Sequence, residues 1–138
     1  MDRMDTAYRT LRLTYGLVPL LAGLDKFFNL LADWPGYLSP AAAAMLPVSP
    51  ATFMQLVGLV EMTVGLLVLT RYARLGAYVA AGWLVLIALN LGLAGRFDVA
   101  VRDLAMAAGA FALARLHEAR ATAPARERRP AAAFAGTR

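Results

Sequence analysis

Residues 20–29 read LLAGLDKFFN, an apolar run that takes on an acid, a base and an amide without a break. Back to Arg12 the segment is almost wholly apolar, and about twenty such residues at a rise of 1.5 Å cross the hydrocarbon core of a bilayer. Asp25, Lys26 and Asn29 are therefore expected within a membrane span. Since an ionisable group in a span is costly unless it faces protein or trapped water, other helices must bring polar groups to this level.

The composition of the chain is that of an integral membrane protein. Of its 138 residues, 60% are hydrophobic and 17% are charged, and the mean hydropathy is +0.58. The net charge of +5 does not indicate a nucleic-acid partner, because the arginines flank apolar runs instead of mixing with aromatic residues on one surface. Without cysteine the chain offers no disulfide, thiolate nucleophile or cysteine-bound iron–sulfur cluster, so we expect no intrinsic redox cofactor.

Four apolar runs predict an all-α integral membrane four-helix bundle, in one transmembrane domain over residues 1–117. The predicted spans cover residues of about 10–31, 51–70, 75–95 and 99–116. Between the first two, Ser39-Pro40 places a capping hydroxyl and a first-turn proline before a short helix through Leu46, which Pro47 ends. We expect this helix at the extracytoplasmic interface, because Trp34 and Tyr37 suit the headgroup level.

Basic residues predict the orientation. Of the 14 Lys and Arg residues, eleven lie in the N-terminal arm, the turn at 71–74 and the C-terminal region, so both termini should lie in the cytoplasm of a bacterium or archaeon. The basic tail at 118–138 has little apolar periodicity and is expected to be disordered or to lie on anionic headgroups. The N-terminal arginines could also open a secretory signal, but no small-residue cleavage site follows them, so the first run should stay as a helix.

Depth along the helices places polar groups of all four spans in one layer. Counted from the basic end of each span at 1.5 Å per residue, Asp25, Glu61, Asn90 and Asp103 lie about 15 to 24 Å deep, in the outer half of the bilayer. The full layer comprises Asp25, Lys26, Asn29, Gln55, Glu61, Asn90, Arg102 and Asp103. We predict one connected network, with Asp25 or Glu61 facing Lys26 or Arg102. Glu61, near mid-span, must be protonated, paired or hydrated, so it is the strongest functional candidate.

Small residues predict where the helices pack. Gly58, Glu61 and Gly65 recur at three and four residues, so they share a helical face that should meet another helix. Gly76 and Gly109 permit close approach in the third and fourth spans. A purely structural interpretation of the polar layer also stands, because buried ion pairs and amides can fix helix register without chemistry.

From residues 12 to 116 the chain resembles the DoxX family of small four-helix membrane proteins. The motifs that carry the resemblance are Arg12-Leu13, Gly16, Gly23 and Lys26 in the first span and Glu61 with Gly65-Leu66-Leu67 in the second. The resemblance makes Lys26 and Glu61 the characteristic polar positions. It implies quinol-linked respiration, sulfur-compound oxidation or redox defence, beside a partner that holds the catalytic centre.

The chain departs from the family pattern at two places, so the resemblance does not transfer an activity. Arg71 stands where a glycine is expected, and the fourth span begins with residues 98–103 in place of a Gly-rich turn ending in Ser-Leu-Asp.

Three functions are therefore open. The first is an accessory subunit of a respiratory or redox complex, non-catalytic alone, that borders a quinone site at the polar layer. The second is a small transporter or proton relay through Glu61, although the chain shows neither paired broken helices nor an inverted repeat. The third is a structural scaffold. Expected partners are the lipid bilayer, another redox subunit and a second copy of the chain; no nucleic acid and no metal are expected.

Overall fold

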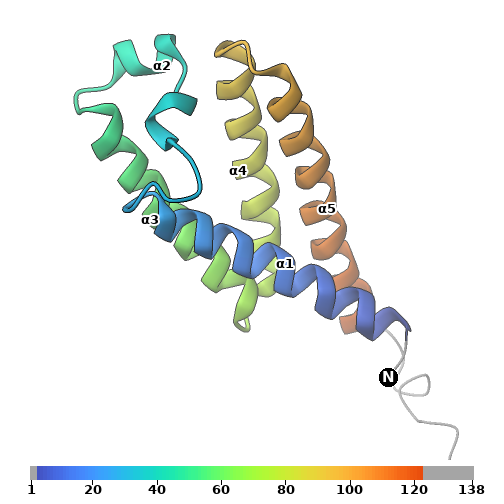
Figure 1. Ribbon diagram of the computed structural model, residues 1–138. Helices are drawn as coiled ribbons and strands as arrows, with labels where there is room; N and C mark the ends of the chain where they lie inside the picture. The colour runs from blue at the N-terminus through green and yellow to red at the C-terminus, as the bar shows by residue number, and fades with distance from the viewer. Residues whose placement is uncertain (1–2, 123–138) are drawn as a thin grey trace, which may run out of the picture.

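The structure, a computed structural model, describes residues 3–122, and this part of the chain is helical without any strand (Figure 1). Its elements in order are α1 (Arg3–Asp25), the 3₁₀ turn η1 (Trp34–Tyr37), α2 (Pro40–Met45), α3 (Pro50–Leu69), α4 (Ala73–Leu93) and α5 (Phe97–Thr122). In space α1 packs along α3 and α4 along α5, and the two pairs meet through α3 with α4 and α1 with α5. The loop with η1 and α2 lies at one end, opposite the N-terminus (Figure 1).

Serine–proline pairs start two of the helices. The Ser39 hydroxyl accepts the backbone N–H of Ala42 and begins α2, and the Ser49 hydroxyl accepts that of Thr52 and begins α3. In both cases the following proline takes the first helical position, where its missing N–H leaves no bond unmade. The predicted short helix is therefore present, and it ends one residue earlier than expected, at Met45.

Glycines bring α1 and α3 together along their length. A Cβ atom on Gly65 would lie 2.5 Å from the carbonyl oxygen of Gly16, and one on Gly58 would lie 2.5 Å from that of Gly23. Both separations are shorter than real Cβ contacts, so these positions accept only glycine without movement. Each helix thus carries two glycines seven residues apart. Because the helices are antiparallel, Gly16 lies against Gly65 and Gly23 against Gly58.

Glycines also bring α4 and α5 against the other pair. A Cβ on Gly76 would lie 2.6 Å from the backbone nitrogen of Val68 in α3. On α5, Gly109 leaves room for the phenol of Tyr15 from α1, whose hydroxyl donates a hydrogen bond of 2.7 Å to the carbonyl of Met106. The core between the helices is accordingly built of small residues, with Ala77, Ala110 and Ala114 fully buried.

Within the first predicted span, 10–31, the helix α1 ends at Asp25. The carboxylate of Asp25 accepts the backbone N–H groups of residues 30 and 31, at 3.1 and 2.9 Å, and the indole N–H of Trp34, at 2.8 Å. Asn29 takes a positive φ of 52°, which turns the chain back over the helix end. Asp25 therefore organises the loop that follows α1.

Two helices of the described part, α3 and α4, are long and apolar enough to cross a membrane. Buried residues make up 33% and 28% of their apolar segments, so most of this apolar surface faces outward. Lipid, not water, suits such a surface. The other two predicted spans fall short of that criterion, since α1 carries Arg9 and Arg12 and α5 carries Asp98, Arg102 and Asp103 among their apolar residues.

The first residues of the predicted tail, 118–122, are not disordered, because α5 continues to Thr122. Glu118 and Arg120 are held by side chains of other helices, which is why the helix does not end with its apolar run. The rest of the predicted tail, 123–138, lies outside the described residues.

Candidate functional site

A buried ion pair joins α3 to the turn that follows α1. The Nζ atom of Lys26 lies 2.6 Å from Oε2 of Glu61, and only 4% and 8% of the two side chains are exposed. Gly23 and Gly58, one turn below each residue, bring the two backbones close enough for this contact. Since each charge neutralises the other, the pair can stay ionised away from water.

The loop after α1 closes over this pair. The ring of Trp34, in η1, lies 3.7 Å from Nζ of Lys26, so the ammonium faces the negative face of the indole. The same indole donates its N–H to Asp25. Trp34 thus covers Lys26 on one side and is fixed by Asp25 on the other, which keeps water away from the Lys26–Glu61 contact.

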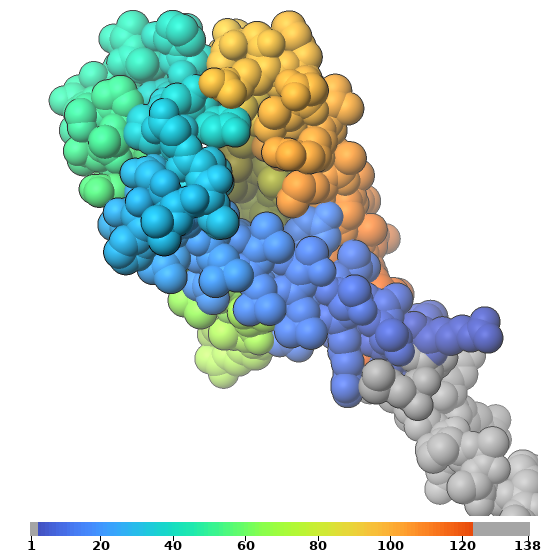
Figure 2. Space-filling view, viewed as in Figure 1, coloured from blue at the N-terminus to red at the C-terminus, as the bar shows by residue number. Residues whose placement is uncertain are grey.

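Two further polar groups reach Glu61 from α4 and α5. Trp83 and Asp103 are partly buried; the Trp83 indole is directed at the Glu61 carboxylate as a donor, and Asp103 acts on that carboxylate through its charge. The indole nitrogen of Trp83 is itself buried and makes no hydrogen bond of normal geometry with any residue of 3–122. Figure 2 shows a hollow in the same half of the molecule, between the loop, α1 and α5, with α4 at its floor.

The loop is fastened to α4 by Asn90. Its side-chain oxygen accepts the backbone N–H of Ser39 at 3.0 Å, and its nitrogen donates to the carbonyl of Tyr37 at 2.9 Å. Arg96, just after α4, stacks on the Tyr37 ring at 4.6 Å and donates to the carbonyl of Gly36 at 3.0 Å. Asn90 is thus a loop anchor, separate from the Lys26–Glu61 pair.

The predicted polar layer is not one connected network in the part of the chain that the structure describes. Gln55, Asn29 and Arg102 are exposed and take no part in the ion pair. Asp25 serves the loop backbone, and Asp103 reaches Glu61 only through its charge. Glu61 faces Lys26 in direct contact, as predicted, and Asp25 is linked to Lys26 only through the Trp34 ring. The other five residues are a loop anchor, a nearby carboxylate or surface groups.

Sequence reasoning missed the contacts of four side chains. Trp34 and Tyr37 were considered only for their level in the membrane, and their rings contact Lys26 and Arg96. Trp83 was not considered, although a tryptophan one turn from small residues on an apolar helix needs a partner for its N–H. Arg12 was considered only as the basic end of the first predicted span, from which depth was counted. In the structure its guanidinium donates to the carbonyls at the end of α3, those of Val68, Leu69 and Thr70, at 2.7 to 2.9 Å.

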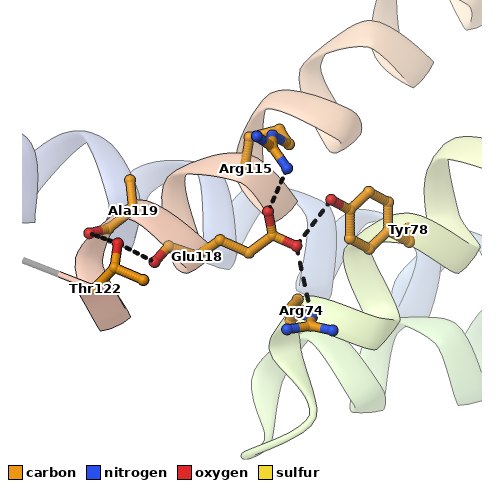
Figure 3. Close-up of polar contacts among 6 residues, drawn as sticks. All are labelled: Arg74, Tyr78, Arg115, Glu118, Ala119 and Thr122. Carbon is orange, nitrogen blue, oxygen red and sulfur yellow. Dashed lines mark hydrogen bonds and ion pairs between the residues drawn. The ribbon is translucent and has the colours of Figure 1, made fainter.

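A second polar cluster lies at the opposite end, around Glu118 (Figure 3). One carboxylate oxygen accepts the Tyr78 hydroxyl at 3.0 Å and lies 3.7 Å from Nε of Arg74, while the other lies 2.6 Å from Arg115. Nearby, the Tyr8 hydroxyl and Nδ1 of His117 are hydrogen-bonded at 2.7 Å. These contacts tie α5 to α4 and α1, so this cluster is a structural joint.

The arrangement defines a class: a helical membrane protein with a loop-covered lysine–glutamate pair. The DoxX family model matches residues 8–93, which is more than half of the chain, and the chain therefore belongs to the DoxX family. The matched region includes Arg12, Lys26 and Glu61. Neither the curated proteins nor the solved structures gave a match. Within residues 3–122 no group of three His, Cys, Asp or Glu side chains could hold a metal ion.

Proposed function

We propose that this chain is an accessory subunit of a membrane redox complex, and that the Lys26–Glu61 site borders a quinone whose electrons a partner protein moves. The observation that carries the proposal is the buried indole N–H of Trp83 beside the ion pair, which is directed at Glu61 but makes no hydrogen bond of normal geometry within residues 3–122. A buried donor whose hydrogen bond is poorly formed is costly, so it favours a better placed acceptor such as a quinone carbonyl.

The chemistry of the site fits such a ligand. A quinone needs an apolar slot for its tail and a few convergent polar groups for its carbonyl oxygens. In this proposal the head lies in the hollow of Figure 2, the Trp83 N–H holds one carbonyl, and Lys26 stabilises negative charge on the reduced head. Reduction of the quinone head would weaken the contact between Glu61 and Lys26, so that Glu61 can carry a proton.

The membrane arrangement in this proposal has four spans. α1 and α5 cross the bilayer beside α3 and α4, with both termini in the cytoplasm and α2 at the outer surface. The arginines of the N-terminal arm, of the α3–α4 turn and of the α5 end gather at one end of the molecule, opposite the loop, which supports this orientation (Figure 1).

The test replaces Glu61 by Gln in native membranes, which keeps the size of the side chain and removes its titratable proton. Assembly of the complex and quinone-linked turnover are measured together. Glu118→Gln is the matched control, because it makes the same chemical change at the opposite end. We expect Glu61→Gln to assemble and to lose turnover, while Glu118→Gln keeps it. If Glu61→Gln retains both assembly and turnover, the scaffold interpretation is correct.

A proton relay is the second candidate, favoured by the charge of Asp103 near Glu61 on a different helix. Two carboxylates that feel each other's charge, one beside Lys26 and the other beside Arg102, provide a place for a mobile proton. Proton flux into liposomes that hold the purified chain alone distinguishes the two candidates. Flux that Asp103→Asn abolishes supports the relay, and no flux without a partner supports the redox subunit.

A further inference from the structure

A groove of about 560 Å³ runs along the end of α3 that is opposite the loop. It is lined by Thr63, Leu66, Leu67, Thr70, Arg71 and Tyr72. The first four recur at three and four residues, so they form one face of α3 that is about 10 Å long at 1.5 Å per residue. The groove therefore has an apolar wall along the helix and a basic, aromatic mouth at the α3–α4 turn.

Arg71 at this mouth keeps most of its charge available. Its guanidinium donates to the hydroxyl of Tyr72 at 2.7 Å and lies 4.9 Å from that ring, and it forms no ion pair with a carboxylate of residues 3–122. Its neighbour Arg74 is paired with Glu118. Arg71 therefore presents donors and charge outward, beside a hydroxyl that it orients.

The carboxyl end of α3 would normally repel an anion, because the last carbonyls of a helix carry partial negative charge. Here Arg12 donates to three of those carbonyls. Its positive charge offsets the helix end, so the field at the groove mouth is set by Arg71. A second groove of about 320 Å³, lined by Arg9, Arg12, Leu13 and Leu69, lies on the other side of the same helix end.

We propose that the α3 groove binds an anionic phospholipid. The phosphate contacts Arg71 and the Tyr72 hydroxyl, and one acyl chain lies along Leu66 and Leu67. Charge complementarity selects the occupant, because a guanidinium at the membrane surface next to an apolar wall matches a headgroup joined to a chain. The site lies at the opposite end from Lys26 and Glu61, so it is independent of the proposed quinone site.

The test measures lipid binding to detergent-purified chain by native mass spectrometry. Phosphatidylglycerol is compared with phosphatidylcholine of the same chains and with inorganic phosphate at equal concentration. Arg71→Gln is compared with Arg3→Gln, which removes an exposed arginine outside both grooves. Leu66→Trp fills the groove without changing its charge, and thermal unfolding without added lipid confirms that each variant is folded.

We expect phosphatidylglycerol to bind and Arg71→Gln to weaken it by about tenfold, as expected for the loss of a charge-assisted hydrogen bond. Leu66→Trp should weaken it too, and Arg3→Gln should not. Equal binding of phosphatidylcholine overturns the proposal, as does an equal loss in Arg3→Gln. Displacement of the lipid by inorganic phosphate alone also overturns it, because the acyl chain would then contribute nothing.

Discussion

Gly58 of α3 lies so close to Gly23 of α1 that a Cβ atom at position 58 would stand 2.5 Å from the Gly23 carbonyl oxygen. The obstacle is backbone, which cannot rotate away as a side chain could. The spacing between the two helices therefore depends on the absence of a side chain at Gly58. The distance between Lys26 and Glu61 depends on that spacing.

The first prediction concerns this contact. Gly58→Ala should lower the free energy of unfolding by about 1 to 3 kcal/mol, because overpacking forces the helices apart. Gly82→Ala is the matched control, since a Cβ at Gly82 would meet nothing within 4 Å. The control should be neutral or slightly stabilising, as alanine favours a helix more than glycine does. Thermal unfolding in detergent measures both, and equal effects would contradict the close approach.

The second prediction concerns the energetics of the ion pair. Lys26→Met or Glu61→Met alone leaves one buried charge without its partner, for which a loss of about 3 to 5 kcal/mol is typical. The double variant leaves no unpaired charge and should recover most of that loss. Denaturant titration of the four proteins forms a complete double-mutant cycle. Additive losses would mean that the two side chains do not interact.

The third prediction concerns the loop anchor. Asn90→Leu removes both hydrogen bonds to the loop, at about 0.6 kcal/mol each by the average for membrane helices, so global stability should fall by about 1 kcal/mol. Hydrogen exchange of residues 36–45 should rise far more than that of α3. Gln55→Leu, at an exposed position, is the control and should leave the loop protected. Unchanged exchange in Asn90→Leu would show that Arg96 alone holds the loop.

The fourth prediction concerns topology, and the absence of cysteine makes it simple to test. Ser39 is fully buried, so Met45, which is 85% exposed, is the better labelling position in the loop. An impermeant thiol reagent should label Met45→Cys in intact cells. It should label Tyr72→Cys, in the turn at the other end, only after permeabilisation. The reverse pattern would place the termini outside.

Much of the helical framework was readable from the sequence, because capping serines, prolines and apolar runs act locally. α3 and α4 begin and end within two residues of the expected spans. The depth of each residue along its helix could also be predicted from the sequence. It placed Lys26 and Glu61 at the same level, and the structure joins them there. Depth does not give rotation about the helix axis, which is why Gln55 was grouped with Glu61 although it points outward.

Other features depended on contacts between distant segments, which one sequence does not display. Asp25 was expected to face another helix, but backbone N–H groups five and six residues later satisfy it first. Glu118 was assigned to a disordered tail, because nothing local shows that Tyr78 and Arg74 would hold it. In both cases the residue type indicated a need for partners, and only the fold identified them.

The position of Asn90 along the chain also bears on the order of assembly. The Lys26–Glu61 contact and the Arg12 cap need only α1, α3 and the segment between them, so both can form before α4 has been synthesised. Asn90 follows Ser39 by 51 residues, near the end of α4. The two hydrogen bonds that fasten residues 37–39 therefore cannot form until α4 has been synthesised. During that interval Trp34 can already cover Lys26, because its indole is held by Asp25 of the same segment, while the part of the loop that follows it still lacks its anchor.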